Sequence, residues 1–182
     1  MILTVFGGSA PVPGTPAYQD AENLGRRAAE AGWTVATGGY MGVMEAVSRG
    51  ANLAGGHVIG VTTEELDRLR PTGANPWVKE ERGFATLRER LGHLVDCCDA
   101  AIAMPGGVGT LAEISILWNG LIIHSLEPRP LVVVGEGWRK LMAILYSELG
   151  EYIRESDREW VAFADNEEQA FRLVQDMLAR AG

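Results

Sequence analysis

The chain has 182 residues, 47% of them apolar and 22% charged, which predicts one folded domain over residues 1–182 and excludes a disordered chain. The 16 Lys and Arg against 24 Asp and Glu give a net charge of −8, which argues against binding to nucleic acid. No apolar run reaches the ~20 residues that cross a bilayer, and the first residues lack the basic flank of a signal peptide. We therefore expect a cytoplasmic protein with no membrane partner.

Short runs typical of strands alternate with helical patterns along the whole chain, as in stacked βαβ units around a mostly parallel sheet. The elements predicted in the first part are a strand over 2–6, a helix from Pro16 capped by Thr15 and ended by Gly32, a strand over 33–37, a helix over 43–53 and a strand over 57–61. Residues 62–83 are polar and contain Pro71, Gly73 and Pro76, so we expect a long loop or lid there.

The second part continues the alternation. Its predicted elements are a helix over 84–97, a strand over 100–104, a helix over 110–124, a strand over 131–134, a helix over 138–149, a strand over 160–163 and a helix over 167–179 capped by Asn166. Together these elements predict the α/β class, as a Rossmann-like, doubly wound three-layer sandwich with a mostly parallel sheet.

Three glycine-rich turns follow predicted strands, at Gly7-Gly8-Ser9, at 38–42 and at 106–110. Ligands of open parallel sheets bind beyond the carboxyl ends of the strands, where glycine lets backbone N–H groups approach a phosphate. The turns therefore indicate a phosphate or nucleotide site, although each glycine taken alone also suits a tight turn without a ligand.

Two known nucleotide-binding motifs narrow the class of protein to which the chain can belong. The chain lacks the Gly-Lys-Ser/Thr ending of a P-loop, which excludes a P-loop kinase or NTPase. Gly107, Gly109 and Ala112 match the dinucleotide fingerprint, but Glu136 lies 27 residues beyond Gly109, whereas the ribose-binding acid usually follows after about 20. A dinucleotide-dependent oxidoreductase remains a minor alternative.

Charged residues at two places near the last turn have a structural interpretation. Thr110 and Glu113 have the spacing of a capping box; alternatively, the helix dipole keeps Glu113 ionised beside a bound ligand. The run Arg88-Glu89-Arg90 favours a solvated helix face when only periodicity is considered.

The segment from Met104 to Glu113 reads M-P-G-G-V-G-T-L-A-E and resembles the signature P-G-G-x-G-T-x-x-E of the LOG (LONELY GUY) family, the cytokinin riboside 5′-monophosphate phosphoribohydrolases. The resemblance extends through the turns at 6–9 and 38–44 to about Val134. It implies that Glu113 and Arg90 are the catalytic residues. The family's M-H-E-R-K is replaced here by L-R-E-R-L over 87–91, which retains Arg90.

The resemblance implies hydrolysis of the N-glycosidic bond of a nucleoside 5′-monophosphate, AMP or an N6-substituted AMP, to free base and ribose 5-phosphate. Glu113 would stabilise the cationic transition state or activate water, and Arg90 would position it. The residues expected to bind substrate are Gly8, Ser9, Gly39, Gly42, Met44, Gly106, Gly107, Val108, Gly109 and Thr110.

We expect no cofactor and no metal, because Cys97 and Cys98 are adjacent and no histidine has a second ligand near it in the sequence. A pyridoxal-phosphate decarboxylase needs a Schiff-base lysine, and neither Lys79 nor Lys140 follows a strand near the glycine turns. The apolar run 114–124 suits a buried helix or a homodimer interface, and the resemblance favours the dimer. The alternative function is a non-catalytic carrier that binds a nucleotide or a molybdenum-type cofactor.

Overall fold

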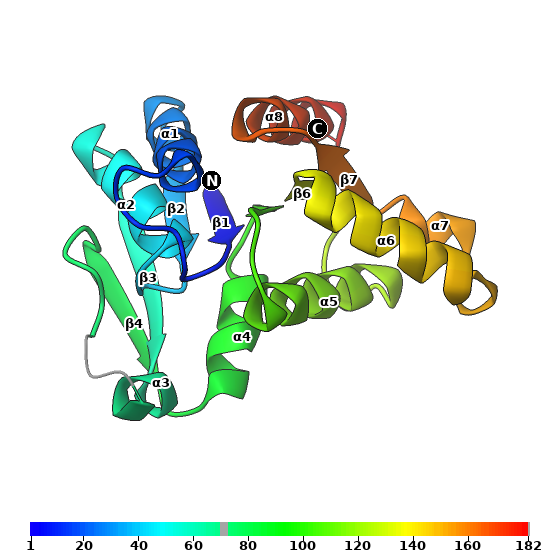
Figure 1. The fold of residues 1–182 in the computed structure, drawn as a ribbon, viewed down its shortest axis with the longest axis horizontal. Helices are drawn as coiled ribbons and strands as arrows, with labels where there is room; N and C mark the ends of the chain where they lie inside the picture. The colour runs from blue at the N-terminus through cyan, green and yellow to red at the C-terminus, as the bar shows by residue number, and fades with distance from the viewer. Residues whose placement is uncertain (70–72, 182) are drawn as a thin grey trace.

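The computed structural model describes residues 1–69 and 73–181. Seven parallel strands form one sheet in the order β4-β3-β2-β1-β5-β6-β7, which confirms the predicted fold class (Figure 1). The strands are β1 (Ile2–Phe6), β2 (Thr34–Thr37), β3 (Val58–Thr63), β4 (Glu80–Phe84), β5 (Ala100–Ala103), β6 (Leu131–Val134) and β7 (Val161–Ala164).

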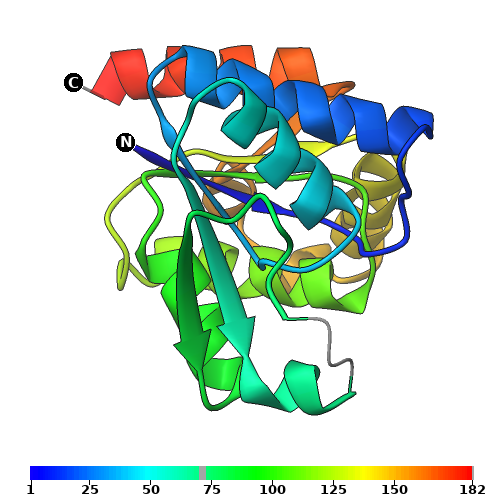
Figure 2. The same cartoon turned by 90° about the vertical axis from the view of Figure 1, so that its left-hand side faces the viewer.

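Helices cover both faces of this sheet. They are α1 (Pro16–Glu30), α2 (Val43–Leu53), α3 (Glu64–Leu69), α4 (Leu87–Asp96), α5 (Val108–Ile122), α6 (Glu136–Glu148), the 3-10 turn η1 (Gly150–Tyr152), α7 (Glu155–Arg158) and α8 (Glu167–Ala181). Figures 1 and 2 show α1 and α8 on one side of the strands and α4 and α5 on the other. Within the described residues, no helix is both long and apolar enough to span a membrane.

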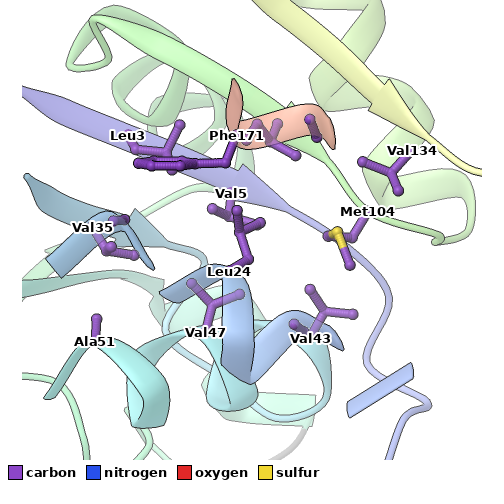
Figure 3. Packing of buried hydrophobic residues seen from close by; sticks show 14 of the residues in the cluster. Leu3, Val5, Leu24, Val35, Val43, Val47, Ala51, Met104, Val134 and Phe171 are labelled. Atoms are coloured by element: carbon purple, nitrogen blue, oxygen red, sulfur yellow. The ribbon is translucent and has the colours of Figure 1, made fainter. Parts of the chain in front are cut away.

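The hydrophobic core is divided between the two faces because successive strand residues point in opposite directions. In β5, Ile102 packs with α1, α2 and α8, whereas Ala101 and Ala103 pack with α4, α5 and α6. Figure 3 shows the first cluster, in which Phe171 of α8 lies near Leu3 of β1. Strands buried on both sides explain the continuous apolar runs of the sequence.

Both predicted N-caps are confirmed. The Thr15 hydroxyl accepts a hydrogen bond from the Tyr18 amide at 3.4 Å, and the Asn166 side-chain oxygen accepts one from the Gln169 amide at 2.9 Å. Each cap satisfies one of the free N–H groups in the first turn of its helix. The sequence thus locates the start of α1 and of α8.

The prediction of a long loop over residues 62–83 is wrong for most of the segment. β3 continues to Thr63, α3 follows directly, and β4 begins at Glu80. β4 is an edge strand whose residues are only partly buried, so it lacks the apolar pattern by which a strand is recognised. Pro71 of the predicted lid lies outside the described residues.

The order of the strands places two glycine turns beside each other. β1 pairs with β2 on one side and with β5 on the other, so the direction of winding reverses between β1 and β5. The Gly8 amide donates to the Pro105 carbonyl at 3.1 Å across this gap. Such a reversal is the usual ligand position in doubly wound sheets.

Candidate active site

A cavity of about 310 Å³ opens where the winding reverses, at the carboxyl ends of β1, β2 and β5. Its walls come from the turn after β1, the turn after β2, α2, α3, α4 and the first turns of α5. The lining residues are Gly7, Gly8, Ser9, Tyr40, Met41, Met44, Leu66, Arg90, Gly107, Val108, Gly109, Thr110 and Glu113. The structure therefore brings both predicted catalytic residues and seven of the ten predicted binding residues to one cavity.

Arg90 reaches this cavity from α4. The capping box of the helix is formed by Thr86 and Glu89, with the Thr86 hydroxyl accepting from the Glu89 amide at 3.3 Å and the Glu89 carboxylate accepting from the Thr86 amide at 3.0 Å. Arg88 is exposed, whereas Arg90 is buried, so the solvated face expected for this run holds only for its first two residues.

The Arg90 guanidinium is held by one backbone carbonyl within β3 and one just beyond the end of β2. Its Nε donates to the Val61 carbonyl at 2.7 Å, and its Nη2 donates to the Gly38 carbonyl at 3.1 Å. The remaining nitrogen, Nη1, lies 3.9 Å from Oε1 of Glu113. The carbonyl contacts fix the orientation of the guanidinium and leave Nη1 as the nitrogen nearest to Glu113.

Glu113 lies on α5, one turn beyond Thr110. The helix begins at Val108 with Gly107 as N-cap, so Thr110 lies within the first turn and the predicted Thr110–Glu113 capping box is not formed. The Glu113 side chain instead lines the cavity and is 10% exposed. Its carboxylate is therefore free of a backbone-capping role.

Burial dominates the electrostatics of the Glu113–Arg90 pair. It raises the pKa of the Glu113 carboxyl to about 7, against the opposing attraction of Arg90. Burial also lowers the pKa of the Arg90 guanidinium, which Glu113 opposes. Burial thus opposes the ionisation that we expect for Glu113 beside a ligand, and the charge of Arg90 supports it.

The first turn of α5 forms the anionic-ligand end of the cavity. Val108, Gly109 and Thr110 have no intrahelical acceptor for their N–H groups, since the first helical bond runs from the Leu111 amide to the Gly107 carbonyl. These N–H groups and the positive end of the helix dipole suit a phosphate. The segment from 106 to 109 is exposed, so a ligand can reach them.

Three predicted binding residues, Gly39, Gly42 and Gly106, are not among the lining residues. Gly42 has φ +75° and lies so close to Ser9 that a Cβ would come within 2.5 Å of the Ser9 Cα. A Cβ at Gly106 would lie 2.2 Å from the Thr110 hydroxyl oxygen. These glycines allow the loops around the cavity to pack together rather than forming its surface.

Four lining residues were not predicted: Gly7, Tyr40, Met41 and Leu66. The Tyr40 hydroxyl accepts from the Thr63 amide at 2.9 Å, and its ring lies 5.6 Å from the guanidinium carbon of Arg90. Tyr40 and Met41 occupy the second glycine turn and could have been found by taking the whole turn as a wall. Leu66 could not, since α3 itself was not predicted.

The lysines and histidines lie elsewhere. Lys79 donates to the Gly56 carbonyl at 2.8 Å and Lys140 pairs with Glu136 at 3.6 Å, and neither lines the cavity. His57 and His93 contact the edge strand β4 through Glu80 and Arg82. Among the described residues, no group of three or more His, Cys, Asp and Glu side chains is placed to hold a metal ion.

Comparison with known proteins decides the family. The model of a family described as "possible lysine decarboxylase" matches residues 44–174. The chain is 32% identical to a cytokinin riboside 5′-monophosphate phosphoribohydrolase of Rhodococcoides fascians over 146 residues, 79% of this chain and 73% of that protein. The chain belongs to the LOG family. LOG7 of Arabidopsis thaliana, with the same enzyme name, is 31% identical over 96% of this chain and 81% of its own length.

A solved structure supports the fold. The molybdenum cofactor binding protein of Rippkaea orientalis superposes with a TM-score of 0.76 over 97% of this chain and 96% of its own, at 23% identity. The same fold therefore also occurs in a protein that is named for binding a molybdenum cofactor. The description "possible lysine decarboxylase" does not agree with the site, because both lysines lie outside the cavity.

Proposed function

We propose that the chain hydrolyses the N-glycosidic bond of a nucleoside 5′-monophosphate, AMP or an N6-substituted AMP, and releases the free base and ribose 5-phosphate. The observation that carries this proposal is the buried Arg90–Glu113 pair, which faces the same cavity as the free N–H groups of α5. The enzyme names of the family members in Rhodococcoides fascians and Arabidopsis thaliana support it.

The 5′-phosphate is held by the first turn of α5, where Gly107, Gly109 and Thr110 line the cavity. From Gly109 to Glu113 the helix rises about 6 Å, a distance that the ribose and its C5′ carbon can span. The anomeric carbon then lies beside the Glu113 carboxylate. The base then lies against the apolar side chains of Met41, Met44 and Leu66, which also line the cavity.

Cleavage breaks the bond between C1′ and the base nitrogen, and the base leaves with the electron pair. Positive charge develops on the ribose, and the ionised Glu113 carboxylate stabilises it in a site where little water screens the attraction. Glu113 also takes a proton from the attacking water, whose oxygen bonds to C1′. That proton is passed to the departing base, so free base and ribose 5-phosphate are the only products.

Arg90 acts on this reaction through Glu113. Its charge opposes the rise in the pKa of Glu113 and so increases the ionised fraction at neutral pH. Its two carbonyl contacts keep the guanidinium in place. Among the described residues, Glu113 is the one carboxylate within ion-pair distance of it. Arg90 is thus the positioning partner of the catalytic carboxylate.

The test is product release. The purified chain is incubated with AMP and with N6-isopentenyl-AMP, and free base and ribose 5-phosphate are measured by chromatography. Glu113→Gln should abolish release while binding of the monophosphate is retained, and Glu136→Gln, an exposed glutamate outside the cavity, should behave as the native chain. Binding without release by the native chain would instead identify a carrier.

We further propose that the chain works as a cytoplasmic homodimer, with one domain over residues 1–182 and no nucleic-acid partner. α5 is buried on one side, yet Val108, Leu111, Ile116 and Ile123 on its other side are 85, 37, 41 and 62% exposed. An exposed apolar helix face of this kind is typical of a subunit interface. The net charge of −8 supports the absence of nucleic acid.

A further inference from the structure

A second cavity, of about 520 Å³, lies at the amino ends of β6 and β7, the opposite end of the strands from the first cavity. Pro130 and Trp160 line it and directly precede β6 and β7, whereas the first cavity lies at the carboxyl ends of the strands. Strands of four residues are about 13 Å long, so about one strand length separates the two ends of the sheet at which the cavities lie. Figure 2 shows the C-terminal end of α8 on the same side of the molecule as the start of β1.

Half of the residues that line this second cavity are apolar. Ile122 of α5 and Met177 and Leu178 of α8 contribute aliphatic surface. The rings of His124 and Trp160 meet edge to face, with centroids 6.4 Å apart and planes at 75°. The other half of the lining is polar or charged, and a cavity of this size that combines apolar walls with placed polar groups is the usual form of a small-molecule site.

His124 adopts a backbone conformation that a side chain disfavours. It has φ 54° and is the only non-glycine residue with positive φ among the described residues. It follows the C-cap Ile123, where the His124 amide donates to the Leu121 carbonyl and the Ser125 amide donates to the Gly120 carbonyl. Glycine is the residue preferred at this helix end. The chain instead places an imidazole at the cavity, on a left-handed backbone conformation.

Arg129 supplies a positive charge to the same cavity. Its guanidinium donates to the carbonyls of Glu127, Val95 and Cys98, at 3.0, 3.3 and 2.5 Å. In the part of the chain that the structure describes, no carboxylate lies within ion-pair distance of it, whereas Arg154 is already paired with Asp157 at 3.0 Å.

The remaining charge on the lining is that of Glu159. This carboxylate is exposed and therefore screened by solvent, whereas Arg129 is partly buried. Asp157, the other carboxylate of the lining, is buried but paired with Arg154, so among the described residues Arg129 is the partly buried charge of this lining that has no ion-pair partner. An aromatic wall beside a guanidinium without a carboxylate partner is a combination that selects a flat ring bearing an anion.

We propose that this cavity binds a small aromatic molecule that carries one anionic group, with its ring against Trp160 and His124 and its anion at Arg129. The site is distinct from the nucleotide cavity and does not depend on the function proposed for that cavity. Its ligand class is that of aromatic carboxylates.

Three probes of one shape and different charge test the proposal on the full chain: 2-naphthoate, 2-naphthylmethanol and 2-naphthylmethylammonium, each titrated by calorimetry. We expect 2-naphthoate to bind at one site per chain and at least about tenfold more tightly than the ammonium probe. Absence of 2-naphthoate binding, or equal or tighter binding of the ammonium probe, would overturn the proposal.

Binding to variants of the chain shows which cavity holds the 2-naphthoate probe. His124→Gly should leave the midpoint of urea unfolding unchanged or higher, because glycine suits this backbone conformation, yet weaken 2-naphthoate binding at least about fivefold. Trp160→Leu should weaken it as well. Arg90→Gln in the first cavity and Tyr152→Ala, an exposed residue outside both cavities, should bind as the native chain. Native binding by His124→Gly, or loss of binding in Arg90→Gln, would contradict the assignment.

Discussion

The guanidinium of Arg90 lies directly against the backbone of Gly38, where a Cβ would stand 2.0 Å from Nη2 and 2.6 Å from the Met44 sulfur. The contact explains a glycine that has no positive φ and does not line the cavity. A side chain at position 38 would require Arg90 to move, because the space beside it is filled by the arginine that faces Glu113.

Gly38→Ala should therefore displace Arg90 and lower kcat/KM for nucleoside monophosphate hydrolysis about 100-fold, the size of effect seen when one electrostatic group of an active site is lost. The measurement is a double-mutant cycle with Arg90→Ala. If Gly38 acts through Arg90, the double variant is about as active as either single variant.

The matched control for this cycle is Gly92→Ala, two residues beyond Arg90 on α4. A Cβ there meets nothing within 4 Å, so alanine should stabilise the helix by about 0.5–1 kcal/mol and leave activity unchanged. Additive losses in the Gly38–Arg90 cycle would show that Gly38 has a role of its own.

The stability of the chain should depend on pH through Glu113. Its pKa is about 7 in the folded chain and 4.5 when unperturbed, so the folded state binds the proton more tightly. This stabilisation is complete below pH 4.5 and is lost as pH rises to about 7. Glu113→Gln removes the titration, and its stability relative to the native chain should rise by about 1–3 kcal/mol between pH 4.5 and 8, measured by urea unfolding. A pH-independent difference would contradict the prediction.

The rate of hydrolysis should follow the ionisation of the same carboxyl. Since the carboxylate is the active form, kcat/KM should rise with pH and level off above an apparent pKa of about 7. Arg90→Gln removes the charge that opposes the rise in pKa, so its profile should shift to higher pH by about one unit. Arg88→Gln, on the exposed side of α4, should keep the native profile. A rate that falls over this range would mean that the protonated acid is the active form.

The proposed dimer depends on the apolar face of α5. Ile116→Asp places a charge on an exposed position of that face and should convert the dimer to a monomer, measured by light scattering during gel filtration. Leu53→Asp, 61% exposed on α2, is the control and should leave the mass unchanged. A native chain that elutes as a monomer would contradict the proposal.

The sequence predicts the parts of the fold that are apolar or punctuated by caps and glycines. β1, β6, α1 and α8 follow from their apolar runs and from Thr15 and Asn166. β4 could not be predicted, because backbone pairing with β3 holds it in the sheet while its side chains remain half exposed.

The candidate site was only partly predictable for a similar reason. Strand ends and glycine turns locate the cavity, and the family resemblance singles out Arg90 within a charged run. Periodicity does not, since the burial of Arg90 depends on the Val61 and Gly38 carbonyls of distant strands. Whether a threonine caps a helix likewise depends on where the helix begins. Thr86 directly precedes α4 and caps it, whereas α5 begins at Val108, two residues earlier than expected, so Thr110 lies inside the helix.

The charged outer strand has a consequence for the behaviour of the chain at high concentration. β4 carries Glu80, Glu81 and Arg82 in succession along one margin of the sheet. An intruding strand from a neighbouring molecule would have to pair beside these charges, which discourages sheet-to-sheet growth into fibrils. The charged residues that prevent β4 from being predicted from its sequence pattern are thus also those that oppose pairing of β4 with a strand of another molecule.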